Sequence, residues 1–202
     1  FHKNNFLPFS LSIKTKKNSY SDKTVIVNYP DKNLIIESSE LALSCCRALK
    51  SDDTLVHLEF IKCNKTGKLF VIDLGLRGAG TYVFGSLISK IISANTAQIE
   101  IDLETRKKFL SFKNNSICFY LYFVTADRNF FFKGINKVYL NQLNLKFYKI
   151  LNIKKKNTMI KFTQSSYDRL ALIIYKFDNY ENLKKNISKL KKKLIDKKII
   201  LK

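Results

Sequence analysis

Glycine is concentrated in one short stretch of this chain, and that stretch constrains the local fold more than any other feature. Five of the six glycines fall within 19 positions, namely Gly67, Gly75, Gly78, Gly80 and Gly85. Glycine is favoured where the backbone turns sharply or must come close to another group. We therefore expect both sharp turns and a binding site in this part of the chain.

Two strand-like segments flank Gly67. Residues 55–61 (Leu-Val-His-Leu-Glu-Phe-Ile) and 69–74 (Leu-Phe-Val-Ile-Asp-Leu) alternate in side-chain character as half-buried strands do. The polar residues between them predict a turn. A three-residue loop over 65–67, with Gly67 in the left-handed conformation, would join the two strands as a hairpin.

The turn also predicts which residues face each other. The three-residue loop places Asn64 opposite Lys68, and the same register places Glu59 opposite Asp73. Opposed side chains in an antiparallel pair have Cβ atoms roughly 4.5–5.5 Å apart, so two carboxylates there repel each other. A divalent cation would remove the repulsion, since Mg²⁺ is usually held by one or two carboxylates with phosphate oxygens and water. A solvent-facing pair and a different register are the alternatives.

The segment after the second strand has the composition of an anion-binding site. Arg77 follows Asp73 by four residues, and two further glycines lead to Thr81, the expected N-cap of a helix over 82–93. A helix N-terminus presents N–H groups and a positive dipole end to an anion. The Arg77 guanidinium adds a planar fork suited to phosphate or carboxylate. The spacing matches neither a P-loop nor a dinucleotide fingerprint.

Together these residues resemble the closing motif of the ATP-grasp superfamily. The matching residues are His57-Leu58-Glu59-Phe60, the turn with Gly67, and Phe70-Val-Ile-Asp-Leu-Gly-Leu-Arg-Gly78. The resemblance implies that Glu59 and Asp73 hold Mg²⁺ on the ATP phosphates. It implies that Arg77 contacts phosphate or an acyl-phosphate intermediate, and that Gly78, Gly80 and Thr81 belong to the loop that binds cofactor and substrate.

Two positions depart from the family pattern. Asp73 replaces a more usual Glu, and Gly75 occupies a position often held by a metal-binding Asn. Some carboxylate–amine ligases of the superfamily also lack that Asn, and the change leaves open a degenerate remnant with weak activity. His57 shares the predicted face of Glu59 and is either a site residue or an ordinary sheet residue.

The resemblance implies an α+β fold. Residues 1–110 would be the C-terminal part of an ATP-grasp domain, an antiparallel sheet with helices, and residues 111–202 a small β-rich subdomain with a basic terminal helix. The implied activity is an ATP- and Mg²⁺-dependent ligase that joins a small carboxylate to an amine or thiol through an acyl phosphate. The family's N-terminal half, which supplies further phosphate contacts, has no counterpart here, so we expect a C-terminal fragment of a longer ligase.

The flanking segments fit this fold. Residues 31–50 predict a helix with Leu41, Cys45 and Leu49 as its apolar stripe, and the spacing of Leu183, Ile187, Leu190 and Leu194 predicts a helix near the C-terminus. Residues 166–175, with Asp168-Arg169, resemble the C-terminal segment of one ATP-grasp branch. The remaining strands are expected at 8–14, 117–125, 129–133, 146–153, 158–163 and 170–177, with their aromatic residues in the core rather than stacked on bases.

The basic charge supports an alternative function. The chain has 37 Lys and Arg against 16 Asp and Glu, a net charge of +21, and residues 184–202 contain nine Lys and one Asp. The lysines are either the solvated face of a helix or a surface for nucleic acid or another polyanion. A basic, non-enzymatic binding module is therefore the alternative, although no zinc-finger or aromatic RNA-binding motif is present. The ligase interpretation includes no nucleic-acid partner.

The sequence also indicates a compartment. Residues 1–30 lack the order of a signal peptide, and no apolar run approaches the roughly 20 residues that span a bilayer. The four cysteines form no C-x-x-C pair, which favours reduced thiols. We expect a cytoplasmic protein without a membrane partner.

Overall fold

The computed structural model describes residues 6–16, 22–80, 82–105, 112–143, 145 and 147–201. The chain forms two compact units, unit 1 from residues 1–11 and 30–115, and unit 2 from residues 12–29 and 116–202. The second change of unit falls between residues 115 and 116, and the division expected at 110/111 stays a prediction. Residues 12–29 differ from that division, because a strand within them pairs with a strand of the second half of the chain.

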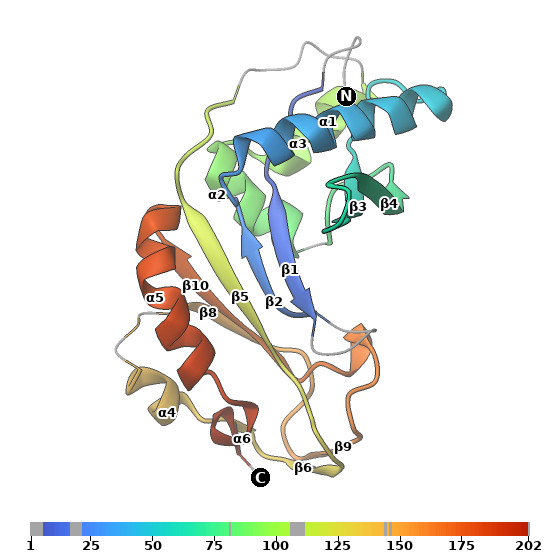
Figure 1. The fold of residues 1–202 in the computed structure, drawn as a ribbon. Helices are drawn as coiled ribbons and strands as arrows, with labels where there is room; N and C mark the ends of the chain where they lie inside the picture. Colours follow the sequence, from blue (N-terminus) through green and yellow to red (C-terminus); the bar gives the residue numbers. More distant parts are fainter. Residues whose placement is uncertain are drawn as a thin grey trace. The chain divides into compact units, whose positions relative to one another are not determined.

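Unit 2 is built on a five-stranded antiparallel sheet (Figure 1). Its order is β1 (Ser12–Lys16), β2 (Asp22–Val27), β5 (Cys118–Val124), β10 (Ala171–Phe177) and β8 (Phe147–Asn152). All seven residues of β5 and the first five of β10 are buried. Strands buried on both faces have continuous apolar sequences rather than alternating ones, which explains why these segments are so rich in aromatic and β-branched residues.

Helix α5 (Tyr180–Lys193) packs on this sheet. The Asn179 side chain caps it by accepting a hydrogen bond from the Asn182 N–H at 2.9 Å. The predicted apolar stripe is confirmed, since Leu183, Leu190 and Leu194 are buried. Five of the six lysines of α5 are exposed, as expected for the outer face of an amphipathic helix.

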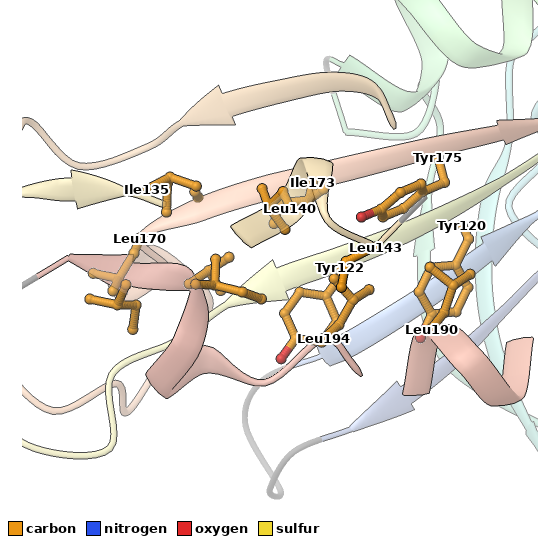
Figure 2. Close-up of a cluster of buried hydrophobic side chains, with 14 of the residues drawn as sticks. Tyr120, Tyr122, Ile135, Leu140, Leu143, Leu170, Ile173, Tyr175, Leu190 and Leu194 are labelled. Carbon is orange, nitrogen blue, oxygen red and sulfur yellow. The ribbon is translucent and has the colours of Figure 1, made fainter. Parts of the chain in front are cut away.

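The core of unit 2 is aromatic, as predicted. Figure 2 shows the rings of Tyr120, Tyr122 and Tyr175 among leucines that include Leu190 and Leu194. Phe119 and Phe132 are also fully buried, whereas Phe131 is 46% exposed. Burying each large apolar side chain contributes about 1.5–3 kcal/mol, so the stability of the fold explains why the buried rings are present.

A polar network ties the last short helix of unit 2 to the sheet. Asp196 begins α6 (Asp196–Ile199) and accepts hydrogen bonds from Lys23 Nζ at 2.5 Å, Tyr122 Oη at 2.9 Å and Thr125 Oγ1 at 2.9 Å. Burial and the neighbouring Asp196 carboxylate raise the pKa of Tyr122. The remaining short elements of unit 2 are β6 (Phe130–Phe132), β7 (Gly134–Ile135), α4 (Lys137–Asn141), β9 (Thr158–Ile160), a 3-10 turn (Ser166–Asp168) and β11 (Ile200–Leu201).

Unit 1 combines helices with one separate hairpin. Its elements are α1 (Lys32–Ala48), β3 (His57–Lys62), β4 (Leu69–Gly75), the π-helix η1 (Val83–Ile88), α2 (Ser89–Ile92) and α3 (Thr96–Glu104). Asp31 caps α1, as its place before the apolar pattern suggests, by accepting from the Leu34 N–H at 3.0 Å. The predicted stripe of α1 is wrong by one position, because Ala42 and Cys46 are its buried residues and Leu49 is 57% exposed.

The helix expected over 82–93 has an unusual start. Its first turns are the π-helix η1, which continues directly into α2 and ends at Ser93 with φ of 51°. Leu87, Ile88, Ile91 and Ile92 form its buried side. Among the residues described, none of the helices combines the length and apolar composition that crossing a bilayer requires.

Candidate functional site

The hairpin of β3 and β4 places Glu59 opposite Asp73, as predicted. The predicted loop is wrong by one residue. Cys63 N–H donates to the Lys68 carbonyl at 2.9 Å and Gly67 N–H to the Cys63 carbonyl at 2.8 Å, so the loop spans four residues, 64–67. Gly67 does have the left-handed conformation, with φ of 70°.

A β-bulge restores the register between the turn and the carboxylates. Phe60 pairs with Val71 and Glu59 with Asp73, which leaves Ile72 as the extra residue. A bulge of this kind lets two residues of one strand oppose one residue of the other. The longer loop and the bulge shift the pairing by one residue in opposite directions, and their effects cancel at Glu59 and Asp73.

One face of the hairpin carries the predicted site residues. Residues two apart in a strand share a face, so His57 and Glu59 lie on the same face as Asp73 and Gly75, which oppose them. His57 Nε2 lies 3.8 Å from Glu59 Oε1, and the Glu59 side chain is 34% exposed. Asp73 is exposed. Both carboxylates are therefore within reach of solvent and of a soluble ligand.

The donor set fits a magnesium ion bound together with phosphate. The described part of the chain contains no group of three or more His, Cys, Asp or Glu side chains that could hold a metal. Glu59 and Asp73 would supply two hard oxygen ligands, and water and phosphate oxygens would take the other positions. That division is the one Mg²⁺ commonly adopts, because it is reluctant to lose all its water.

Arg77 follows β4 and folds back over its last residue. A Cβ atom placed on Gly75 would lie 3.2 Å from Arg77 Cγ and 3.3 Å from Arg77 Nε. The Arg77 guanidinium also donates from Nη1 to the Gly78 carbonyl at 2.8 Å. Because Gly75 faces His57 on the carboxylate face, these contacts bring the arginine to the same face as Glu59 and Asp73.

The loop after Arg77, which contains Gly78 and Gly80, is packed against the π-helix η1. A Cβ atom on Gly78 would lie 2.4 Å from Phe84 Cδ1, so only glycine fits beneath that ring. Phe84 is stacked in turn on Phe9, with ring centroids 6.3 Å apart. Sequence reasoning missed Phe84, because no local pattern in the sequence indicates that its ring covers Gly78.

At the start of the helix, where an anion site was predicted, the N–H groups of Val83 and Phe84 are already hydrogen-bonded within the chain. Val83 and Phe84 donate their N–H groups to the Gly80 carbonyl at 2.9 Å and 3.3 Å, so these two donors are engaged. A Cβ atom on Gly80 would meet nothing within 4 Å. Thr81, the predicted N-cap and binding residue, lies outside the described residues. Arg77, by contrast, is described, and its guanidinium uses one of its five N–H donors on the Gly78 carbonyl.

Comparison with known proteins supports the resemblance at the level of the fold. No protein-family model and no curated protein sequence matches the chain. Its structure is similar to an L-amino acid ligase from Bacillus licheniformis, with a TM-score of 0.77 at 14% identity over 100% of this chain and 50% of that one. It is also similar to phosphoribosylglycinamide synthetase from Anaerococcus prevotii, with a TM-score of 0.65 at 18% identity over 100% of this chain and 51% of that one. The chain has the fold of the C-terminal half of ATP-grasp enzymes.

A third ATP-grasp neighbour was solved with a nucleotide. It is the biotin carboxylase domain of Hydrogenobacter thermophilus 2-oxoglutarate carboxylase in complex with MgADP and bicarbonate, with a TM-score of 0.52 at 13% identity over 90% of this chain and 40% of that one. The chain thus spans about half the length of its ATP-grasp neighbours or less. The α+β class and the antiparallel sheet predicted from the sequence are confirmed.

Proposed function

We propose that this chain supplies the metal- and phosphate-binding half of an ATP- and Mg²⁺-dependent ligase that joins a carboxylate to an amine or thiol. Glu59 and Asp73 would hold the ion, Arg77 would bind the phosphate or the acyl phosphate, and Gly78, Gly80 and Thr81 would shape the surrounding loop. The observation that carries this proposal is the pair of opposed carboxylates with Arg77 on the same face of a hairpin within an ATP-grasp fold.

The proposed reaction has two steps. A carboxylate oxygen of the substrate attacks the γ-phosphorus of ATP and ADP leaves, and the amine then attacks the acyl carbon and phosphate leaves. Mg²⁺, when bound, would neutralise charge on the phosphate oxygens. Glu59 and Asp73 would hold the metal ion in place. Arg77 would stabilise the transferred phosphoryl group with directed hydrogen bonds.

The hairpin also indicates the partner of this half. Among the described residues β3 and β4 pair only with each other, and a two-stranded hairpin is at best marginally stable alone. Ile61, Phe70 and Ile72 on this hairpin are each more than half exposed. The ATP-grasp neighbours are about twice as long as this chain. We infer that the N-terminal half of an ATP-grasp fold covers these side chains, in a cytoplasmic enzyme with small-molecule substrates.

The proposal is tested on the gene product in which this chain occurs. It is incubated with MgATP, hydroxylamine and a panel of amino acids, and both ADP release and hydroxamate are measured, because hydroxylamine traps an acyl phosphate. Glu59→Gln and Asp73→Asn should each abolish both signals. Glu104→Gln, an exposed carboxylate on α3, is the matched control and should have no effect. Full activity in both hairpin variants would refute the assignment.

The exposed lysines of α5 favour the second candidate, a module that binds nucleic acid or another polyanion. Such binding would weaken steeply as salt rises, with a linear dependence of log affinity on log salt. Absence of nucleic-acid binding at low salt, about 50 mM, would count against this candidate. Intact Mg²⁺ binding without any ATP turnover would instead identify a degenerate ATP-grasp remnant.

A further inference from the structure

We infer that Gly75 is a positioning residue. Because it has no side chain, it leaves a space, here called the seat, in which the Arg77 guanidinium lies beside the Glu59–Asp73 pair. This inference rests on the proposed function, because it concerns the same phosphate site. It goes beyond that function by assigning a role to a position at which this chain has no side chain at all.

The first step is that the backbone does not require glycine at this position. Gly75 ends β4 and does not have a positive φ, whereas Gly67 does. Glycine weakens a strand, because it loses more backbone entropy on folding and has no side chain to pack. A glycine in a strand therefore commonly marks a place where another group approaches closely.

The second step identifies the group that approaches. The three atoms nearest to a Cβ on Gly75 all belong to Arg77, with Cγ at 3.2 Å, Nε at 3.3 Å and Cζ at 3.6 Å. The aliphatic stem and the start of the guanidinium therefore lie directly against the position that a Cβ atom at residue 75 would take. Since Gly75 opposes His57 and follows Asp73 by two residues, that volume is on the carboxylate face.

The third step is that the far end of the arginine is also held. Arg77 Nη1 donates to the Gly78 carbonyl at 2.8 Å, and Gly78 is itself packed beneath the Phe84 ring. This bond uses one of the five N–H donors of a guanidinium. A side chain whose stem lies against the strand and whose end is hydrogen-bonded loses less conformational entropy when it binds an anion, so the seat increases phosphate affinity without touching the phosphate.

The test uses a graded pair of substitutions at position 75. Gly75→Ala would require Arg77 to move by a few tenths of an ångström, and Gly75→Val would fill the seat. Both residues are compatible with a strand, and valine is favoured there. Gly85→Ala is the matched control, because a Cβ atom on Gly85 would meet nothing within 4 Å.

Binding is measured on the full chain by NMR, with inorganic pyrophosphate and Mg²⁺ as the probe. The Nε–Hε signal of Arg77, assigned by its loss in Arg77→Lys, reports the seat directly. We expect about tenfold weaker pyrophosphate binding in Gly75→Val, an intermediate loss in Gly75→Ala and no change in Gly85→Ala. In an Arg77→Ala background, Gly75→Val should have no further effect.

Mn²⁺ broadening of the hairpin signals distinguishes the two ways of failing. If Mn²⁺ does not bind near Glu59 and Asp73 in the unaltered chain, the proposed function itself is wrong. If Mn²⁺ binds but Gly75→Val retains full pyrophosphate affinity, or loses it equally in the Arg77→Ala background, the seat is refuted. Retained amide dispersion in Gly75→Ala shows that a loss of affinity is not a loss of folding.

Discussion

Removing one carboxylate from the hairpin should have opposite effects on its stability with and without Mg²⁺. Glu59 and Asp73 face each other in register across β3 and β4. Without a cation the two charges repel each other, so Asp73→Asn should stabilise the hairpin. With Mg²⁺ present, the unaltered chain gains binding energy that the variant loses, so the order of stability should reverse.

The size of the repulsion follows from the spacing of the pair, and the size of the Mg²⁺ effect follows from mass action. Opposed positions have Cβ atoms roughly 5 Å apart, and two unit charges placed at that separation in water repel by about 0.8 kcal/mol. That energy changes the opening equilibrium of the hairpin about fourfold. Low salt is required, because the Debye length of about 8 Å at 0.15 M would remove a large part of the repulsion. Mg²⁺ at ten times its dissociation constant should stabilise the unaltered hairpin by about 1.4 kcal/mol, or about elevenfold.

Amide hydrogen exchange is the appropriate assay, because it reports the local opening of β3 and β4 separately from unit 2. Without Mg²⁺, protection of the hairpin amides should be about fourfold higher in Asp73→Asn than in the unaltered chain. Adding Mg²⁺ should raise protection only in the unaltered chain. The control Glu104→Gln removes the same charge from α3 and should leave hairpin protection unchanged. Lower protection in Asp73→Asn without Mg²⁺ would refute the repulsion, and equal gains with Mg²⁺ would refute the metal site.

Three further predictions concern packing and buried groups. Gly78→Ala should destabilise unit 1 by about 1–3 kcal/mol, because the added Cβ would lie 2.4 Å from Phe84 Cδ1. Thermal unfolding of Gly78→Ala and of the control Gly85→Ala checks this, and equal melting temperatures of the two variants would contradict it. Asp196→Ala should destabilise unit 2 by about 1.5–3 kcal/mol, since Asp196 accepts hydrogen bonds from Lys23, Tyr122 and Thr125. Urea denaturation measures the loss of unfolding free energy, and a change below about 0.5 kcal/mol would show that the network contributes little. Tyr175→Phe should leave stability at neutral pH unchanged or raise it, because the buried Tyr175 hydroxyl has no hydrogen-bond partner among the described residues. Burial raises the pKa of Tyr175 from 10.0 to about 12, so the native state favours the neutral phenol. The resulting stabilisation is complete below pH 10 and is lost as the pH rises from 10 to 12. Tyr175→Phe should therefore reduce the loss of unfolding free energy at alkaline pH, and an unchanged pH profile would contradict this.

Several features could be predicted because neighbouring residues determine them. The stripe of Leu183, Ile187, Leu190 and Leu194 predicted α5, since a helix brings residues three and four apart to one face. The aromatic run of β5 predicted a buried strand. The elements missed although they carry local signals include β2, with its β-branched run, and α3, whose Asn95 cap accepts from the Ala97 N–H at 3.1 Å.

The sequence by itself determined the strands of the hairpin and the left-handed glycine of its turn, and its motifs carry the resemblance that implies a site of Glu59, Asp73 and Arg77. The strands and the glycine follow from periodicity and turn chemistry, which act over a few residues, whereas the site is implied by the resemblance. Only the tertiary structure decided that β2 pairs with β5, that Ile72 forms a bulge, that Arg77 occupies the space beside Gly75, and that Phe84 covers Gly78. Each of these depends on which groups meet after the chain has folded, and no spacing in the sequence records how much room one side chain leaves for another.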